Sequence, residues 1–254
     1  MEILLEGKEV SKYFGGLAAL FDVTFYIRKG EIVGLIGPNG AGKTTLVNTI
    51  TGIYPVSKGN IRFKEEDITH AKPYHIGRMG IARTFQIVKA FSGMTVEENV
   101  LIGALFGKSG LKRTKQEALR KVGEVLEFVG LVKKKDAPVE ETTIPDRKRL
   151  ELAKALAMEP ELLFLDEVMA GLRPKEMDDM MALLKELNRN GITILLIEHV
   201  MKAIMGISDR VIVLHEGRLI AEGTPEEISK DEKVIKAYLG SRYAKRRDEE
   251  VDHA

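Results

Sequence analysis

The chain has 254 residues, of which 39 are Lys or Arg and 38 are Asp or Glu, so its formal net charge is +1. This near balance gives no sign of a nucleic-acid partner, and the length suits one large α/β domain or a domain with an inserted lobe. The absence of Cys excludes disulfides and cysteine-ligated metals and suits a reducing cytosol.

Neither a targeting segment nor a membrane span is expected. Residues 1–6 lack a basic stretch followed by an apolar core, which a signal peptide would need. No apolar run approaches the roughly 18 residues of a transmembrane helix. Any connection to a membrane is therefore expected to pass through a partner.

Two strands are expected near the N-terminus, at residues 3–7 and 21–27, the second because apolar and polar residues alternate. The residues between them, 12–16, are expected to form a loop that offers Tyr13 and Phe14. An aromatic side chain at this position could stack on an adenine ring, since such stacking accepts any planar partner. The alternative is that one of these rings fills the core.

The strongest pattern lies at residues 37–45, which match G-x-x-x-x-G-K-[ST] between an apolar strand at 31–36 and the start of a helix. In that setting the glycines let backbone N–H groups turn inward around phosphate, and the helix N-terminus adds positive charge. Lys43 is expected to reach the β- and γ-phosphates, and the Thr44 hydroxyl to bind Mg²⁺. The sequence thus predicts nucleoside triphosphate binding; a glycine-rich turn without ligand is the alternative. The predicted binding residues of this loop are Gly37, Pro38, Asn39, Gly40, Ala41, Gly42, Lys43, Thr44 and Thr45.

The next segment is expected to alternate strands and helices. A strand at 59–63, a polar turn at 64–69, a helix at 72–79 and a strand at 80–86 follow in order. The last strand ends on Gln86, whose amide could contact Mg²⁺ or position water at a phosphate site. A lone Gln is also often a solvated loop residue.

Residues 95–157 lose the strand signals and favour helices at about 95–107 and 114–129. We expect a helical lobe inserted into an α/β sheet. The lysine run 133–135 is expected in a solvated loop, with a phosphate or lipid role as the alternative.

A further helix is expected to begin near residue 144 and run to about 158. Thr143 with Asp146 three residues later resembles a capping box, although Asp stands where Glu or Gln is usual. Pro145 suits the first turn of a helix.

Two carboxylates end the apolar strand predicted at 161–167. In a buried parallel strand, Asp166 would lie at the carboxyl edge of the sheet, where α/β ligand sites occur. Asp166 could hold Mg²⁺ through water, and Glu167 could orient or deprotonate an attacking water. The alternative is a structural pair of acids. His199 follows the next predicted strand, at 191–197, and is expected at the same edge.

The remaining chain is expected to close the fold. A helix is predicted at 174–189, a hairpin from strands 210–214 and 218–221, short helices at 224–229 and 231–239, and a frayed charged tail at 241–254.

The ordered set of the phosphate loop, Gln86, the Asp166-Glu167 pair and His199 resembles the ATP-binding subunit of ABC transporters over nearly the whole chain. The resemblance implies an α/β P-loop NTPase: a mostly parallel core sheet, an antiparallel β subdomain and an inserted helical subdomain. It implies one domain at 1–240, with the core and β subdomain at 1–86 and 159–240, the helical subdomain at about 87–158, and the tail at 241–254.

Finer motifs resemble the branched-chain amino-acid transporter subgroup. They are Arg83-Thr84-Phe85-Gln86, Met94 to Asn99, Ile207-Ser208-Asp209-Arg210, Ile220 to Pro225 and Ala237-Tyr238-Leu239-Gly240. Those systems carry two different ATPases, and the Thr-Phe-Gln form resembles one of them. The resemblance implies a partner ATPase, two membrane permease subunits, an extracytoplasmic binding protein, ATP and Mg²⁺ as cofactors, and a place on the cytoplasmic face of the cell membrane.

By the same resemblance, Phe14 corresponds to the adenine-stacking aromatic, Gln86 to the Q-loop glutamine, Glu167 to the catalytic base and His199 to the switch histidine. The implied Mg²⁺ ligands are Thr44, Gln86 and Asp166. In this family two subunits enclose two ATPs, each between one subunit's phosphate loop and the other's signature sequence, usually Leu-Ser-Gly-Gly-Gln.

The signature position departs from that pattern, because it holds Thr142-Thr143-Ile144-Pro145-Asp146. Thr143 keeps the hydroxyl of the usual serine. Pro145 replaces a glycine whose N–H would face the γ-phosphate, and Asp146 adds negative charge there. Losing one such donor costs on the order of 3 kcal/mol in comparable catalytic sites. Val168 replaces the proline that commonly follows the Asp-Glu pair in this family. Arg173 replaces the polar or acidic residue of the segment that the family calls the D-loop.

The altered signature predicts a heterodimer with one strong and one weak hydrolytic site, because this chain would lend the altered signature to its partner. Other cargo, such as exported lipid, stays open, as does a regulatory nucleotide binder with little turnover. A soluble ABC ATPase acting on DNA or ribosomes is disfavoured, since neither heptads nor an internal repeat is found.

Overall fold

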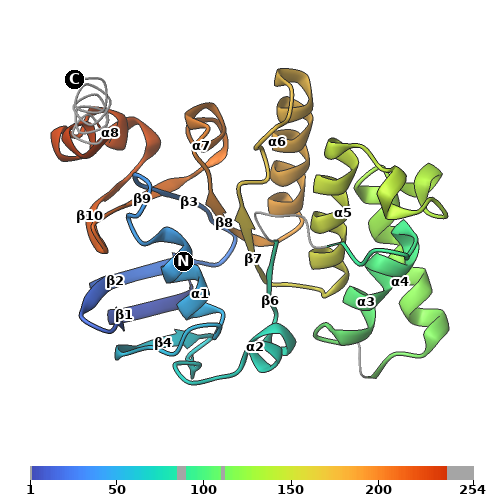
Figure 1. The fold of residues 1–254 in the computed structure, drawn as a ribbon, viewed down its shortest axis with the longest axis horizontal. Helices are drawn as coiled ribbons and strands as arrows, with labels where there is room; N and C mark the ends of the chain where they lie inside the picture. The colour runs from blue at the N-terminus through green and yellow to red at the C-terminus, as the bar shows by residue number, and fades with distance from the viewer. Residues whose placement is uncertain (1, 85–89, 110–111, 239–254) are drawn as a thin grey trace, which may run out of the picture. The chain divides into compact units, whose positions relative to one another are not determined.

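The computed structural model describes residues 2–84, 90–109 and 112–238. The chain divides into two compact units (Figure 1). The terminal unit comprises residues 1–70 and 208–254, and the central unit comprises residues 71–207.

The terminal unit combines an antiparallel sheet with the strand that leads into the phosphate loop. The antiparallel sheet has the strand order β2-β1-β4-β5, while β3 pairs in parallel with β9, which pairs antiparallel with β10. Its elements are β1 (Ile3–Phe14), β2 (Leu17–Arg28), β3 (Ile32–Ile36), α1 (Lys43–Ile50), β4 (Lys58–Phe63), β5 (Glu66–Asp67), β9 (Arg210–His215), β10 (Arg218–Gly223) and α8 (Pro225–Lys230).

The first hairpin is longer than predicted. β1 continues to Phe14, which pairs with Leu17 across a tight turn, so the prediction of a loop over 12–16 is wrong for residues 12–14. The register shifts between Gly7 and Val10, and it shifts again further along the strand. Such irregularities break the alternation of buried and exposed residues on which a sequence-based strand assignment depends.

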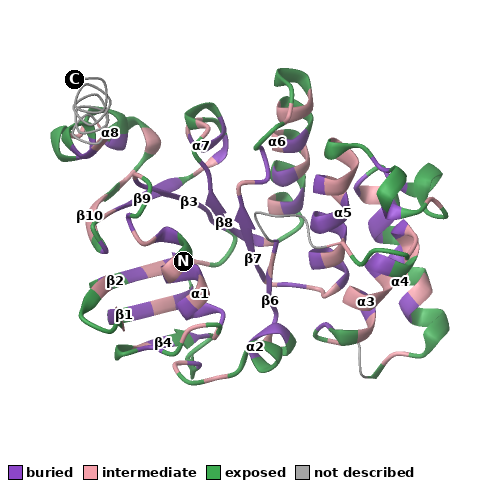
Figure 2. Cartoon of the chain, in the orientation of Figure 1, coloured by how far each residue is buried: buried purple, intermediate pink, exposed green. Residues whose placement is uncertain are grey.

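The central unit contains three parallel strands and the helices around them. β6 pairs with β7 and β7 with β8, with Asp166 opposite Ile197, and every residue of β7 and β8 is buried (Figure 2). Helices α3, α4 and α5 pack against one another. The elements are α2 (Pro73–Met79), β6 (Ile81–Arg83), α3 (Val96–Phe106), α4 (Lys115–Phe128), α5 (Ile144–Ala157), β7 (Leu162–Asp166), α6 (Pro174–Arg189), β8 (Thr193–Ile197) and α7 (Met201–Ile207).

Most predicted helices begin and end within two residues of their observed bounds, because each has a clear start signal. Thr95, Thr114 and Thr143 each cap a helix through a complete capping box. Helix α7 was not predicted from the sequence. None of the described helices is both long and apolar enough to cross a membrane. The predicted subdomain bounds stay predictions, and the predicted tail lies outside the described residues.

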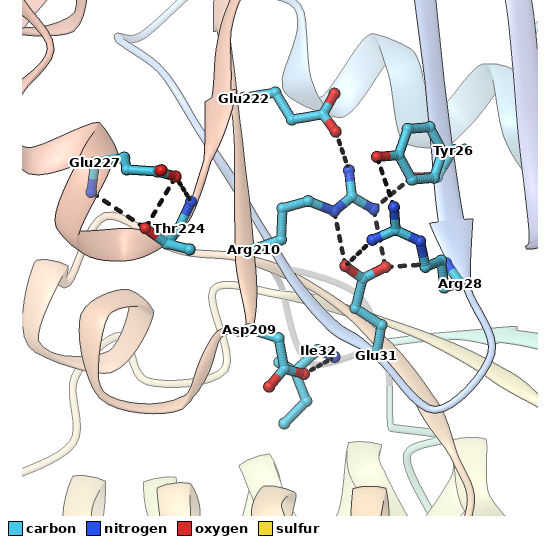
Figure 3. A network of polar contacts seen from close by, with 9 residues as sticks. All are labelled: Tyr26, Arg28, Glu31, Ile32, Asp209, Arg210, Glu222, Thr224 and Glu227. Atoms are coloured by element: carbon cyan, nitrogen blue, oxygen red, sulfur yellow. Dashed lines mark hydrogen bonds and ion pairs between the residues drawn. The ribbon is translucent and has the colours of Figure 1, made fainter. Parts of the chain in front are cut away.

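A buried ion-pair network holds the start of β3, the strand that leads to the phosphate loop (Figure 3). Arg210 donates to both oxygens of Glu31 at 2.7 and 2.8 Å, to Glu222 at 2.6 Å and to the Tyr26 carbonyl at 2.8 Å. Burial opposes ionisation of Glu31, but hydrogen bonds and charge from Arg210 and Arg28 outweigh it and lower its pKa from the ordinary 4.5. This stabilisation is therefore present above about pH 4.5 and is lost as the pH falls through the lowered value.

Asp209 also holds the start of β3, through its contacts with Ile32. Its carboxylate accepts the Ile32 N–H at 2.8 Å, and its own N–H donates to the Ile32 carbonyl at 2.8 Å. Asp209 and Arg210 therefore fix where β3 begins.

Arg210→Ala is expected to lower the free energy of unfolding by about 3–5 kcal/mol, because Glu31 would stay buried without its main cation and keep only the longer ion pair with Arg28. Arg120→Ala removes an exposed pair on α4 and is expected to cost under about 0.5 kcal/mol. Urea unfolding of both variants measures the difference, and equal losses would contradict a structural role for the Arg210 network.

Candidate functional site

The phosphate loop lies between β3 and α1, and its backbone leaves no room for side chains at two glycines. Gly37 has φ 153°, and a Cβ there would lie 2.2 Å from the Leu214 carbonyl oxygen. Gly42 has φ 101°, and a Cβ there would lie 2.8 Å from the Ala19 carbonyl oxygen. The Gly217 N–H also donates to the Ala41 carbonyl at 3.0 Å. These contacts explain why the loop needs glycine at both positions.

The N-terminus of α1 suits an anion. Gly42 caps this helix without a side-chain hydrogen bond, and its first turn carries no acidic residue. Helix N–H groups at such an end attract phosphate. The Lys43 ammonium donates to the carbonyls of Gly37 and Pro38 at 2.7 and 3.1 Å, so it lies along the loop. The first-turn Thr44 is exposed. This donor set fits a triphosphate, with a hydroxyl available for Mg²⁺.

Phe14 lies at the end of β1 with 43% of its surface exposed, so it does not fill the core. Its ring meets Tyr54 edge-on at 5.1 Å between centroids, and the Lys12 ammonium lies 4.9 Å from the Phe14 centroid. Lys12 also donates to the Pro55 carbonyl at 2.9 Å. The Phe14 ring is thus held by Tyr54 and Lys12 and remains accessible to a planar ligand.

In the central unit, Asp166 ends β7 and is 3% exposed. Its Oδ2 accepts from Arg83 Nη2 at 2.8 Å, and its N–H donates to the Thr84 hydroxyl at 3.2 Å. The Asp166 carboxylate is therefore buried, paired and held by the residues that end β6. An oxygen ligand of this kind suits Mg²⁺.

Glu167 and His199, which follow β7 and β8, are in contact; the sequence had predicted only that His199 lies at the same sheet edge as Asp166. The distance between His199 Nε2 and Glu167 Oε1 is 2.9 Å. Glu167 has φ 51°, which is rare for a residue other than glycine. Its N–H donates to the Ile197 carbonyl, and Lys148 Nζ donates to its carbonyl, both at 2.9 Å. Backbone strain held by surrounding contacts is typical of functional positions.

Glu198 is a buried carboxyl that our sequence interpretation did not single out. It is 2% exposed, and its Oε1 accepts the Met169 N–H at 2.7 Å. Burial, aided by the nearby charge of Glu167, raises the pKa of Glu198 to about 7 despite that hydrogen bond. The contact ties the end of β8 to the segment after Glu167, which leads into α6.

The signature segment has its polar groups engaged within the chain. The Thr143 hydroxyl donates to Asp146 Oδ2 at 2.6 Å, and Lys134 Nζ donates to the same oxygen at 2.5 Å. These contacts outweigh burial and lower the pKa of Asp146. Its charge is therefore balanced by Lys134, which the sequence analysis assigned to a solvated run. Pro145 supplies no N–H in the first turn of α5.

The predicted site residues belong to both units. Phe14 and residues 37–45 lie in the terminal unit, while Asp166, Glu167, His199 and Thr143 lie in the central unit, where the first three follow neighbouring strands. Gln86 lies outside the described residues.

The sequence patterns did not indicate the roles of Lys134, Lys148 and Glu198 or the contact of Arg83 with Asp166. Only Glu198 carried a usable signal, since it directly follows an apolar strand as Asp166 does.

Comparison with known proteins shows the family of this chain. A family model described as "ABC transporter" matches residues 20–170, and one described as "Branched-chain amino acid ATP-binding cassette transporter" matches residues 218–244. The chain is 44% identical over 239 residues to the high-affinity branched-chain amino acid transport ATP-binding protein LivG of Salmonella typhimurium, covering 89% of this chain and 94% of that protein. It is 39% identical over 249 residues to BraF of Pseudomonas aeruginosa, a protein of the same description, covering 93% and 98%.

Solved structures confirm the predicted fold class. An ATP-binding cassette of an ABC transporter in its ADP conformation matches with a TM-score of 0.87 at 33% identity, covering 94% of this chain and 100% of that one. A dimeric cassette in a post-hydrolysis state with ADP and phosphate matches with a TM-score of 0.78 at 25% identity, covering 87% and 99%. The chain therefore belongs to the ATP-binding cassette family of ABC transporters, in its branched-chain amino acid group, and is an ATPase that binds ATP with Mg²⁺.

Proposed function

We propose that this chain powers an importer of branched-chain amino acids from the cytoplasmic face of the cell membrane, together with permease subunits, an extracytoplasmic binding protein and a second, different ATPase. The relatives named for branched-chain amino acid transport support the cargo. The contact between Glu167 and His199 beside Asp166 is the observation that carries the hydrolytic role, because it joins a candidate base to a group that can orient it.

Each residue has a distinct task in this proposal. The N–H groups of residues 37–45 and the Lys43 ammonium hold the phosphates, and Phe14 stacks on adenine. Thr44, Gln86 and Asp166 bind Mg²⁺, which supplies charge stabilisation at the phosphates. Glu167 activates water, and His199 fixes the position of that carboxylate.

Glu167→Gln is expected to lower the rate of ATP hydrolysis by about 10²–10⁴-fold while nucleotide binding stays intact, because an amide cannot take the proton. Lys43→Ala is expected to weaken binding itself, since the phosphates lose their cation. Equilibrium binding of labelled ATP together with turnover separates the two effects.

Glu186→Gln, on the exposed face of α6, serves as a control and is expected to behave like the unaltered chain. Substantial turnover by the Glu167 variant would rule out Glu167 as the base.

The altered signature favours pairing with a different subunit. The Thr143 hydroxyl already donates to Asp146, and Pro145 offers no N–H, so this segment brings few donors to a neighbouring ATP. Lys134 neutralises much of the Asp146 charge. The shortage of hydrogen-bond donors for the γ-phosphate is therefore expected to impair hydrolysis more than the negative charge does. In a pair made of two copies of this chain, both ATP sites would receive the altered signature. A partner with a Leu-Ser-Gly-Gly-Gln sequence would supply the usual donors to one of the two sites.

Pro145→Gly combined with Asp146→Gly is expected to raise turnover by the isolated chain about 10²-fold, because residue 145 regains its N–H donor and the Thr143 hydroxyl is released from Asp146. Steady-state hydrolysis by the purified chain measures this, with Lys133→Ala as a control in the neighbouring loop. Unchanged turnover would show that the signature does not limit hydrolysis. Equal single-turnover ATP loss at both sites of a natural pair would contradict the asymmetric heterodimer.

The cargo is tested separately. Vesicles that contain this chain, its permease subunits, its partner ATPase and the binding protein should take up leucine in a manner that depends on ATP. Uptake of an unrelated solute, or lipid movement instead, would assign the same ATPase to another transport system.

A further inference from the structure

Arg83, the last residue of β6, and Thr84, which follows it, hold Asp166 at two points. β6 and β7 run in parallel with Arg83 opposite Phe164, so both strands end at the same edge. The Thr84 N–H donates to the Phe164 carbonyl at 2.9 Å, and the Thr84 hydroxyl accepts the Asp166 N–H at 3.2 Å. Arg83 Nη2 then donates to Asp166 Oδ2 at 2.8 Å. Thr84 thus fixes the backbone of Asp166, and Arg83 fixes its carboxylate.

Both members of this ion pair are buried. The exposed fraction is 9% for the Arg83 side chain and 4% for that of Asp166. A carboxylate in such surroundings is costly unless a cation and hydrogen bonds compensate for the lost water. Arg83 supplies that charge from within the chain, so the Asp166 side chain is held in one orientation independently of any bound metal.

A divalent cation at Asp166 would face this same guanidinium. A carboxylate has about four lone-pair directions, and the Arg83 contact leaves Oδ1 for a metal-bound water. Two cations that share one carboxylate repel each other at low effective dielectric. The ion pair should therefore preorganise Asp166 and also weaken its hold on Mg²⁺.

We propose that Arg83 is a positioning residue that holds Asp166 ready for Mg²⁺ and sets how much Mg²⁺ the nucleotide site requires, with Thr84 fixing the backbone beneath it. This inference rests on the proposed role of Asp166 as a Mg²⁺ ligand. It gives a physical task to the Arg-Thr of the Arg83-Thr84-Phe85-Gln86 motif.

Arg83→Gln tests the proposal because it keeps a donor but removes the charge. Without nucleotide and in EDTA, this variant is expected to unfold several degrees below the unaltered chain. The Mg²⁺ concentration at half-maximal binding of a fluorescent, non-hydrolysable ATP analogue is expected to fall about tenfold, because the competing cation is gone. Arg83→Lys, which keeps the charge, should restore the higher Mg²⁺ requirement.

A matched control separates this effect from a general loss of stability. Arg113→Gln removes another ion pair of the central unit, to Glu159, and is expected to lower the unfolding temperature without shifting the Mg²⁺ midpoint. Asp166→Asn should make Arg83→Gln nearly neutral for stability, because the buried carboxylate is then absent.

Two results would overturn the inference. One is an unchanged Mg²⁺ midpoint in Arg83→Gln, and the other is an equal loss of stability from Arg83→Gln whether or not the chain also carries Asp166→Asn. If Asp166→Asn itself leaves the Mg²⁺ midpoint unchanged, the assignment of Asp166 as a ligand fails instead. These outcomes distinguish a failure of the proposed site from a failure of the role given to Arg83.

Discussion

The pairing of Arg210 with Glu31 is the interaction on which the phosphate loop depends. Arg210 joins the start of β9 to the residue that precedes β3, and Asp209 fixes the first N–H of that strand. β3 is short and wholly buried, so its starting point decides where the loop after Ile36 emerges. The loop itself has little freedom, because Gly37 and Gly42 approach neighbouring carbonyls too closely for any side chain. The phosphate-binding backbone is thus held by charges and close packing outside it.

The central unit contains buried carboxyl groups whose loss of water must be compensated by other contacts. Asp166 and Glu198 both lie buried after apolar strands, yet their surroundings differ. Asp166 meets the guanidinium of Arg83, whereas Glu198 accepts backbone N–H groups and has a raised pKa. Glu167, which directly follows Asp166, is held in a left-handed backbone conformation and contacts His199. The two buried acids therefore have different partners, a guanidinium for Asp166 and backbone N–H groups for Glu198.

The sequence patterns predicted the elements that have local causes. Helical spacing located α3 and α4, and the Thr143-Asp146 pattern located the start of α5. The apolar runs that lead to Asp166 and His199 located two strands and their common edge. The pattern failed for β1, where shifts in register mix buried and exposed residues beyond Gly7. The lysine run 133–135 is exposed as predicted, but its sequence gave no sign that Lys134 would pair with Asp146.

The sequence by itself determined that this chain carries a phosphate loop, an Asp-Glu pair and a histidine after successive strands, and that its signature lacks the usual glycines. Those features depend on residue types at short spacing in the chain, and local backbone geometry alone relates such spacing to strands, turns and helices. Only the tertiary structure decided that Arg83 holds Asp166, that Lys134 neutralises Asp146, and that Arg210 anchors the strand before the loop. Each of these pairs joins residues at least 12 positions apart, and their meeting depends on strand register and helix packing.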